Sequence, residues 1–271
     1  VEKKYEYKIR VIGSNITLDR FYKDDDNISV MQDLIEISSP NLREKTIFVW
    51  PEGIIPDISQ DELKEYNLLF DKKFNENHLF IIGANSYLIE NEFKSYFNSF
   101  AIFDNKLNLI NLYNKINLVP FGEFLPFEKF LNQLGLKKIT QGHGSFSKGK
   151  TQKNIIFDNI NILPLICYEI IFPELLQRAD DKTNLIVNIS EDGWFGNSIG
   201  PYQHFAKAIY RSIENDVYLV RSANKGISAI ISNKGEIIKQ LNINETGSIE
   251  MDIPLINSKY KNKNDLIFFI L

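Results

Sequence analysis

Short runs of β-branched and aromatic residues recur along this chain, and polar stretches with turn-forming residues separate them. Runs of this length and composition are typical of β-strands. They predict strands at Tyr7–Ile16, Ile47–Trp50, Leu79–Leu88, Phe97–Asp104, Asn161–Cys167, Leu185–Ile189, Val217–Ser222, Ile227–Ser232 and Gly247–Ile253.

Two of the intervening stretches repeat apolar residues with the 3.6-residue period of a helix. The first follows Ser59-x-x-Glu62, which has the spacing of a capping box. Its apolar stripe comprises Leu63, Tyr66, Phe70 and Phe74. The second stripe follows Gly200-Pro201 and comprises Phe205, Ala208, Ile209, Ser212 and Ile213. Asn233-Lys-Gly235 predicts a hairpin turn, and the mixture of strands and helices without a break in composition predicts one α/β domain.

Composition excludes several classes of function. The net charge of −4, with acidic and basic residues mixed along the chain, provides no basic field for nucleic acid. The single cysteine cannot form an internal disulfide. The three histidines, His78, His143 and His204, have no paired spacing, so no metal site is expected. His204 stands at a predicted helix start and is interpreted as a hydrogen-bonded packing residue.

Cys167 ends the mostly apolar run that begins at Ile160. Pro173 and Glu174 follow it and are typical of the first turn of a helix. A thiol between a strand end and a helix start lies near oriented backbone N–H groups, which favour its reactivity. A lone cysteine is more often a small buried apolar residue, so the hypothesis of a nucleophile depends on two other segments.

The first of these segments holds Glu52, which follows a strand ending at Trp50 and a turn fixed by Pro51. A carboxylate inside such an apolar stretch is costly unless it is paired or has a chemical task. General base catalysis is one such task. Taken alone, the segment favours a glutamate that caps a loop.

The second segment holds Lys115, which lies in alternating apolar sequence, and Glu123, which lies between Gly122 and Phe124. An isolated strand lysine usually keeps its ammonium group in solvent. Since Lys115 has apolar neighbours on both sides, it is also a candidate for a fixed positive charge that stabilises an oxyanion.

Glu, Lys and Cys in this chain order, each near a strand end, resemble the nitrilase (carbon–nitrogen hydrolase) superfamily. In finer detail the chain resembles the catalytic domain of the bacterial apolipoprotein N-acyltransferase family, from about Tyr5 to Ile253. The motifs that carry this resemblance are Trp50-Pro-Glu52, Lys115, Leu118-Val-Pro-Phe-Gly-Glu123, Cys167-Tyr-Glu169, Asp192-Gly-Trp-Phe-Gly196, Gly200-Pro201, Gln203-His204, Arg211, Glu214, Arg221, Asn224 and Gly226.

The resemblance implies a four-layer α-β-β-α sandwich for residues 1–260. It also implies a catalytic triad of Glu52 as base, Lys115 as oxyanion donor and Cys167 as nucleophile. Three further residues are expected to support the triad: Glu123 by orienting Lys115 or assisting proton transfer, and Tyr168 and Glu169 by lining the pocket. No cofactor or metal is expected, because thiol, base and oxyanion donor suffice.

The implied reaction moves a fatty acyl group from a phospholipid, through a thioester on Cys167, to the N-terminal amine of a diacylglyceryl-cysteine apolipoprotein. Trp194, Phe195 and Phe124 are candidates for the apolar wall that receives the acyl chain. The family acts at the bacterial inner membrane, with this domain on the periplasmic side. Residues 261–271 turn abruptly apolar, and we interpret them as the start of a C-terminal membrane helix.

Two alternatives share this fold. A nitrilase-type amidase would use the same triad to hydrolyse a small amide, although many such hydrolases carry an arginine where this chain has Ile171. A non-catalytic binding domain is expected to lack a member of the triad, and here all three are present.

Overall fold

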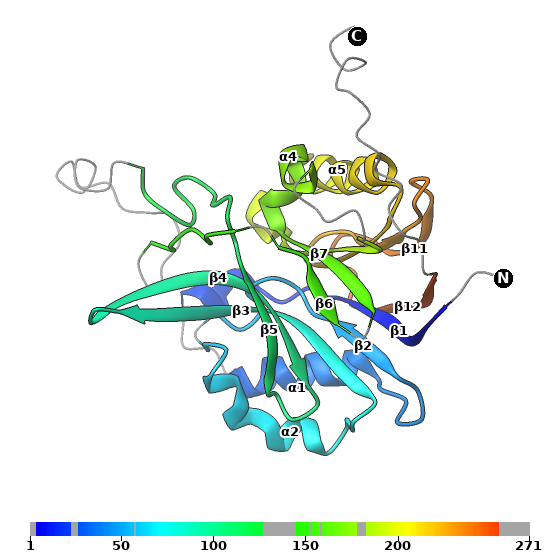
Figure 1. The fold of residues 1–271 in the computed structure, drawn as a ribbon, viewed down its shortest axis with the longest axis horizontal. Coiled ribbons are helices and arrows are strands. Elements are labelled where there is room, and N and C mark those ends of the chain that lie inside the picture. Colours follow the sequence, from blue (N-terminus) through cyan, green and yellow to red (C-terminus); the bar gives the residue numbers. More distant parts are fainter. Residues whose placement is uncertain are drawn as a thin grey trace, which may run out of the picture.

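The computed structural model describes residues 4–22, 27–56, 58–126, 145–151, 153–157, 159–177 and 183–254. Two six-stranded mixed sheets face each other at the centre of the molecule (Figure 1). The first sheet has the order β12-β1-β2-β3-β4-β5, and the second has the order β11-β10-β9-β8-β7-β6.

The strands of the first sheet are β1 (Lys4–Gly13), β2 (Thr46–Val49), β3 (His78–Glu90), β4 (Phe93–Asp104), β5 (Leu109–Asn114) and β12 (Gly247–Pro254). Those of the second are β6 (Ile155–Phe157), β7 (Ile160–Ile166), β8 (Leu185–Glu191), β9 (Tyr218–Asn224), β10 (Ser228–Ile231) and β11 (Ile237–Leu241). In each sheet three neighbouring strands are parallel, β1-β2-β3 and β7-β8-β9, and all other neighbouring strands pair antiparallel.

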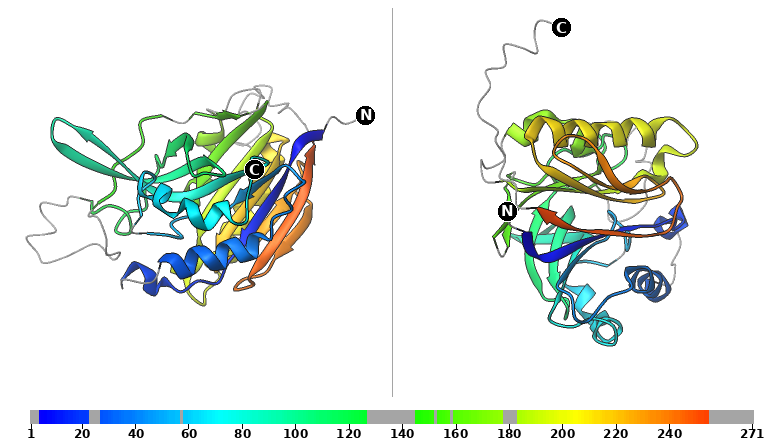
Figure 2. Two further views of the ribbon diagram at one scale, coloured as in Figure 1. Left: turned by 90° about the horizontal axis from the view of Figure 1, so that it is seen from below. Right: turned by 90° about the vertical axis from the view of Figure 1, so that its right-hand side faces the viewer.

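Helices cover the outer face of each sheet (Figure 2). The helices α1 (Asn27–Ser38) and α2 (Asn67–Asp71) lie on the first sheet, and α4 (Pro173–Gln177) and α5 (Gly200–Asn215) lie on the second. Buried apolar side chains form one core between the sheets and one under each helical layer. The predicted four-layer α-β-β-α sandwich is therefore confirmed.

The described residues contain all of the predicted strands and three further strands that were not predicted. These three strands, β5, β6 and β11, lie at sheet edges. Edge strands need only one neighbour and bury less apolar surface, so their sequences carry a weaker pattern. In β11, for example, four of the five residues are exposed. The predicted first strand also extends too far, because β1 ends at Gly13 rather than at Ile16.

Of the two predicted helices, the first is only partly helical and the second is present over its full length. Ser59 donates its backbone N–H to Glu62 Oε2 at 2.8 Å, which is one half of the predicted capping box. The other half is absent, because Ser59 Oγ donates to the same oxygen at 2.7 Å and the Glu62 N–H donates to the Ser59 carbonyl. A 3-10 turn over Glu62–Tyr66 leads into the short helix α2, and Phe74 lies beyond the end of that helix. The second helix is confirmed as α5, except that Ile213 is 48% exposed rather than packed. The hairpin turn at 233–235 is also confirmed, between β10 and β11.

The parallel strands bring distant segments together at one end of the sandwich. Parallel strands present their carboxyl ends at the same edge of a sheet. The segments that follow β2, β7 and β8 therefore meet where the sheets face each other. Ser14, just after β1, forms a parallel bridge with Asn224 at the end of β9, and its Oγ donates to Asn224 Oδ1 at 2.7 Å. This bridge ties the two sheets together beside the meeting point.

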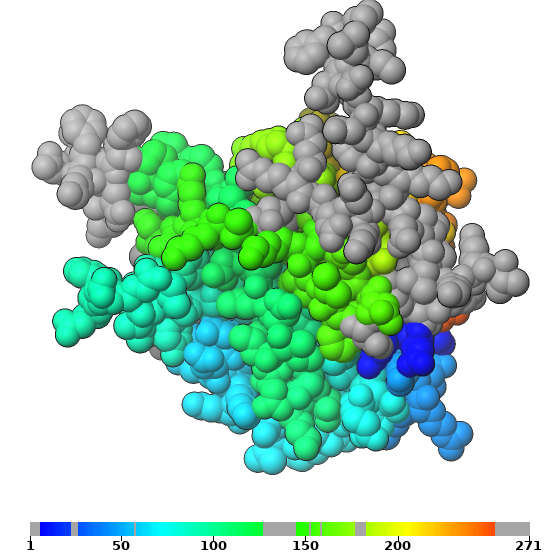
Figure 3. Space-filling view, viewed as in Figure 1, coloured from blue at the N-terminus to red at the C-terminus, as the bar shows by residue number. Residues whose placement is uncertain are grey.

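The β3–β4 hairpin extends beyond the rest of the sandwich (Figure 3). Its tip exposes apolar side chains, among them Ile89 and Phe93. Its base contributes Asn98, which points back into the interior and is only 8% exposed. The hairpin therefore supplies a buried polar group close to the strand ends described above.

Within the described ranges, no helix has both the length and the apolar character needed to cross a bilayer. The predicted start of a membrane helix at residues 261–271 lies outside the described residues. Two other apolar residues next to Phe124 in the sequence, Phe127 and Phe130, also lie outside them.

Gly83 of β3 allows the turn after β2 to lie directly on the sheet. A methyl group on Gly83 would stand 2.4 Å from Glu52 Cα and 2.7 Å from Pro51 O. Both contacts are with backbone, which cannot move aside without shifting the turn.

We expect Gly83→Ala to lower the free energy of unfolding by about 1–3 kcal/mol, the usual cost of overpacking, and to displace Glu52. Urea unfolding of both proteins measures the loss. Gly247→Ala is the matched control, because its added methyl group would meet only the Leu241 side chain, at an ordinary 3.4 Å. Equal unfolding curves for Gly83→Ala and the wild type would contradict this description of the turn.

Candidate active site

Cys167 occupies a strained turn at the carboxyl end of β7. The strand ends at Ile166, and a 3-10 turn over Cys167–Ile171 begins at once. Cys167 has φ +46°, a left-handed conformation that residues other than glycine seldom adopt. Its side chain is 9% exposed. Helix α4 then begins at Pro173, as predicted. The chain thus holds its single thiol on a sharp bend rather than inside a regular element.

Glu52 and Lys115 contact each other in the space between the sheets. Glu52 is 6% exposed and Lys115 is 1% exposed. Lys115 Nζ lies 3.2 Å from Glu52 Oε1 and donates to it. The other oxygen, Glu52 Oε2, accepts the backbone N–H of Glu191 at 2.9 Å. Both carboxylate oxygens are therefore fixed, so Glu52 has a defined orientation.

Glu123 is the second carboxylate on Lys115. Its Oε1 accepts from Lys115 Nζ at 2.9 Å, and its Oε2 accepts from the Val119 backbone N–H at 2.8 Å. Asn98 Nδ2 donates to Glu123 Oε1 at 2.6 Å and to Glu52 Oε1 at 2.7 Å. The Asn98 amide thus bridges two carboxylates that would otherwise repel each other. Glu123 lies where the sequence placed it, next to Lys115.

The electrostatics of this cluster assign different protonation states to Lys115 and Cys167. Burial by itself would lower the pKa of Lys115, but Glu123 and Glu52, and to a smaller extent Cys167, raise it above its ordinary value. Lys115 is therefore a permanent ammonium, suited to stabilising negative charge. Burial and the charge of Glu52 raise the pKa of the Cys167 thiol, against the attraction of Lys115. The thiol is thus neutral at rest and needs a base to become a nucleophile.

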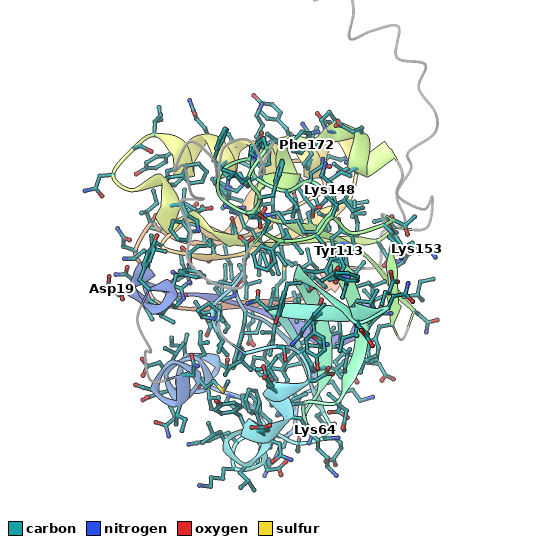
Figure 4. The ribbon with its side chains drawn as sticks, turned by 90° about the vertical axis from the view of Figure 1, so that its left-hand side faces the viewer. Asp19, Lys64, Tyr113, Lys148, Lys153 and Phe172 are labelled. Atoms are coloured by element: carbon teal, nitrogen blue, oxygen red, sulfur yellow. The ribbon has the colours of Figure 1, made fainter. Side chains whose placement is uncertain are left out.

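Glu169 was expected to line the pocket, but its side chain lies inside the protein. Its side chain is completely buried, and burial raises its pKa. Its Oε1 accepts from Tyr113 Oη at 2.8 Å and from the backbone N–H of Ile116 at 2.7 Å, and its Oε2 accepts from the Ile166 N–H at 2.9 Å. Tyr113 lies in β5, at the junction of the two sheets (Figure 4). Glu169 therefore fastens the segment after Lys115 to the turn that holds Cys167.

Tyr168 and the three predicted apolar wall residues are only partly buried. Tyr168 packs against Phe172, with ring centroids 5.0 Å apart. Trp194 and Phe195 are 40% and 39% exposed, and Phe195 packs edge-on against His204 with centroids 5.5 Å apart. Phe124 lies on the same turn as Glu123 and is half-buried. The turn and the segment 192–195 thus present accessible aromatic surface next to the buried ionic cluster.

Two residues that contact Glu52, Asn98 and Glu191, were not predicted from the sequence. Asn98 lies inside β4, and nothing in an alternating strand marks one polar residue as buried. Glu191 ends β8, where its backbone N–H holds Glu52 and its side chain forms a buried ion pair with Arg20. Burial raises the pKa of Glu191 to about 7, although Arg20 opposes the shift. The sequence did contain one indication of Glu191, because the strand-like run that begins at Leu185 ends in two acidic residues, Glu191 and Asp192.

Within the described residues, no group of three or more His, Cys, Asp or Glu side chains is arranged to hold a metal ion. The acidic residues at the centre are instead satisfied by Lys115, Asn98 and backbone N–H groups. The chemistry available here is that of a thiol, two carboxylates and an ammonium group.

If Glu52 acts as the base for Cys167, Glu52→Gln changes the pKa of the thiol and the rate of turnover in opposite senses: the thiol ionises more easily, but turnover becomes slower. Removal of the negative charge lowers the pKa of Cys167, so alkylation by iodoacetamide at a fixed pH becomes faster. Removal of the base slows turnover that depends on the Cys167 thiolate by about 100-fold or more. The pH dependence of alkylation and a turnover assay measure the two effects.

Glu90→Gln, at an exposed carboxylate paired with Lys150, is the control and leaves both rates unchanged. Slower alkylation in Glu52→Gln, with the pH midpoint moved upward, would show that the charge of Glu52 does not act on Cys167 as described.

Comparison with known proteins agrees with this geometry. Residues 8–258 match the model of the carbon-nitrogen hydrolase family. The chain is 38% identical over 214 residues to the apolipoprotein N-acyltransferase of Rhizobium leguminosarum bv. trifolii, covering 78% of this chain and 40% of that protein. It is 33% identical over 261 residues to the apolipoprotein N-acyltransferase of Bradyrhizobium diazoefficiens, covering 91% of this chain and 48% of that protein. The chain thus spans less than half the length of these relatives.

Solved structures show the same fold at low sequence identity. Saccharomyces cerevisiae Nit3, a member of the nitrilase superfamily, superposes with a TM-score of 0.63 at 17% identity, over 92% of this chain and 90% of that one. An amidase from Nesterenkonia sp. AN1, with acrylamide added at its active-site cysteine, superposes with a TM-score of 0.60 at 15% identity, over 98% and 100% of the two chains. Fold, family model and relatives agree, and the chain belongs to the carbon–nitrogen hydrolase family.

Proposed function

We propose that this chain is the catalytic domain of an apolipoprotein N-acyltransferase. It transfers a fatty acyl group from a phospholipid to the N-terminal amine of diacylglyceryl-cysteine apolipoproteins. The observation that carries the proposal is the buried cluster of Glu52, Lys115 and Glu123 facing a thiol on a strained turn. The relatives named apolipoprotein N-acyltransferase, at 30–38% identity, support this choice of reaction.

In the first half-reaction, Glu52 takes the proton of the Cys167 thiol, and the thiolate attacks the ester carbonyl of the phospholipid. Lys115, with the backbone N–H of Tyr168, stabilises the tetrahedral oxyanion. The ester C–O bond then breaks, and Glu52 returns the proton to the departing lysophospholipid oxygen. A thioester remains on Cys167.

In the second half-reaction, the N-terminal amine of the apolipoprotein attacks the thioester carbonyl, and Glu52 accepts a proton from the amine. The same donors stabilise the second oxyanion. The C–S bond breaks, the new amide is released, and Glu52 returns the proton to the Cys167 sulfur. Both half-reactions balance without a cofactor, because one carboxylate carries one proton back and forth.

The accessible aromatic side chains support a lipid as acyl donor. Phe195 packs against His204, which contacts the Cys167 carbonyl, and Trp194 packs against Phe21. Phe124 lies on the turn that carries Glu123. Exposed aromatic rings beside a buried charge cluster suit an acyl chain whose carbonyl must reach the thiol. We place the protein at the bacterial inner membrane, with this domain on the periplasmic side, where its two lipid substrates meet.

Incubation of the full-length protein with phospholipid in detergent micelles, followed by intact mass measurement, tests the proposal. We expect Cys167 to gain the mass of one fatty acyl group, and the adduct to disappear when a diacylglyceryl peptide is added. Cys167→Ala forms no adduct and loses at least about 1000-fold in turnover. Cys167 is the single cysteine of this chain, and peptide mapping of the adduct locates the acyl group on it.

The amidase alternative predicts another result. A protein that takes up no acyl group from phospholipid, yet hydrolyses small amides in a Cys167-dependent reaction, would be a nitrilase-type amidase and would contradict the acyltransferase proposal.

A further inference from the structure

His204 connects helix α5 to the backbone of the nucleophile. Its imidazole is 4% exposed, and its Nε2 lies 3.0 Å from the carbonyl oxygen of Cys167. A carbonyl oxygen can only accept, so Nε2 carries a proton and donates it to this bond. The interpretation of His204 as a hydrogen-bonded packing residue is confirmed, but its partner is the peptide group of Cys167.

A buried polar network fixes the other side of the imidazole ring. His204 Nδ1 lies 3.0 Å from Asp192 Oδ1, and Arg221 Nη2 donates to both oxygens of Asp192 at 2.8 and 2.7 Å. Arg221 Nε also donates to the carbonyl oxygen of Ile227 at 3.2 Å. Asp192 and Arg221 are 1% and 0% exposed. The imidazole therefore has one orientation, set from three chain segments.

The space around Asp192 leaves no room for another arrangement. A methyl group on Gly226 would stand 2.1 Å from Asp192 Oδ2. Ser190 Oγ donates to Asp192 Oδ1 at 2.8 Å. Burial alone would raise the pKa of Asp192, but Arg221 and His204 hold it well below its usual range. Asp192 is thus a fixed anion behind the ring, and its position does not change with pH near neutrality.

The bond to the Cys167 carbonyl has a direct geometric consequence. The peptide group between Cys167 and Tyr168 is planar and trans, so its C=O and N–H point in opposite directions. If His204 fixes the direction of the carbonyl, it also fixes the direction of the Tyr168 N–H. The strained φ of +46° at Cys167 makes such an external restraint necessary, because an unrestrained residue would relax to negative φ.

We propose that His204, held by Asp192 and Arg221, is a positioning residue that aims the Tyr168 N–H at the oxyanion. The proposal rests on the proposed acyl transfer through Cys167, and it adds a second support to the oxyanion site. His204 itself does not exchange protons with substrate, because its Nε2 proton is engaged by the Cys167 carbonyl and its Nδ1 faces Asp192.

Two reagents applied to the full-length protein distinguish an effect of His204 on the oxyanion site from a general effect on folding. A p-nitrophenyl ester acylates Cys167 through an oxyanion and gives a burst of p-nitrophenolate. Iodoacetamide alkylates the same sulfur without forming an oxyanion. His204→Leu removes the donor to the Cys167 carbonyl. His204→Gln keeps an N–H near the position of Nε2.

His78→Gln is the matched control. His78 is also a completely buried histidine with Nε2 on a backbone carbonyl, that of Asn41 at 3.2 Å, but it packs among Phe48 and Phe74 outside the first sheet. It therefore reports the cost of replacing a buried histidine away from the site.

We expect His204→Leu to slow the acylation burst by about 100-fold, the usual effect of a misplaced catalytic group, and alkylation by less than about 3-fold. His204→Gln recovers most of the burst rate, and His78→Gln leaves both rates near those of the wild type. Equal losses of acylation and alkylation in His204→Leu would overturn the proposal, and so would an unchanged burst rate or no recovery in His204→Gln.

The ester separates this proposal from the proposed function. A wild-type protein that accepts the ester but not phospholipid contradicts the acyltransferase assignment, and the comparison of His204 variants still decides the role of His204. A wild-type protein in which Cys167 is not acylated by the ester contradicts both.

Discussion

The site depends on one buried ammonium group held between two carboxylates. Lys115 contacts Glu52 and Glu123, and the Asn98 amide donates to the same two oxygens. A buried cation alone would be very costly, and so would a pair of adjacent buried carboxylates. Together they compensate one another, but only in this geometry. Removing Lys115 would leave two facing carboxylates without their cation, and removing either carboxylate would leave the ammonium with one partner instead of two. The cluster therefore fixes the positions of the segments that carry it.

These segments all belong to the first sheet or follow its strands, and backbone hydrogen bonds join them to the second sheet. Glu52 follows β2 in the first sheet, and it accepts the N–H of Glu191 at the end of β8 in the second. Glu169, on the turn that holds Cys167, accepts backbone N–H groups of the segment after Lys115. The facing sheets therefore do more than bury apolar surface. They bring a carboxylate, an ammonium group and a thiol close together, and carboxylates that accept backbone N–H groups of the opposite sheet hold them there.

Sequence reasoning could find residues that break a pattern. Cys167 ends an apolar strand, Glu52 follows one directly after a proline, and Lys115 is a charge in alternating apolar sequence, so all three stand out. Asn98 does not, because a polar residue in an alternating strand is normally exposed. The edge strands β5, β6 and β11 were missed because each has only one neighbour in its sheet and little of its surface is buried, so its apolar pattern is weak. The role of Glu169 was predicted as pocket lining, and only the fold reveals that its carboxylate binds Tyr113 and three backbone N–H groups.

The central claim is that Lys115 and the turn at Cys167 stabilise an oxyanion formed on an acyl group bound to sulfur. A crystal structure of the acylated full-length protein, trapped before transfer to an amine, tests it most directly. The account predicts a thioester on Cys167 whose carbonyl oxygen lies about 3 Å from Lys115 Nζ and from the Tyr168 backbone nitrogen. A thioester oxygen that points away from both groups, with Lys115 still bound only to Glu52 and Glu123, would contradict it.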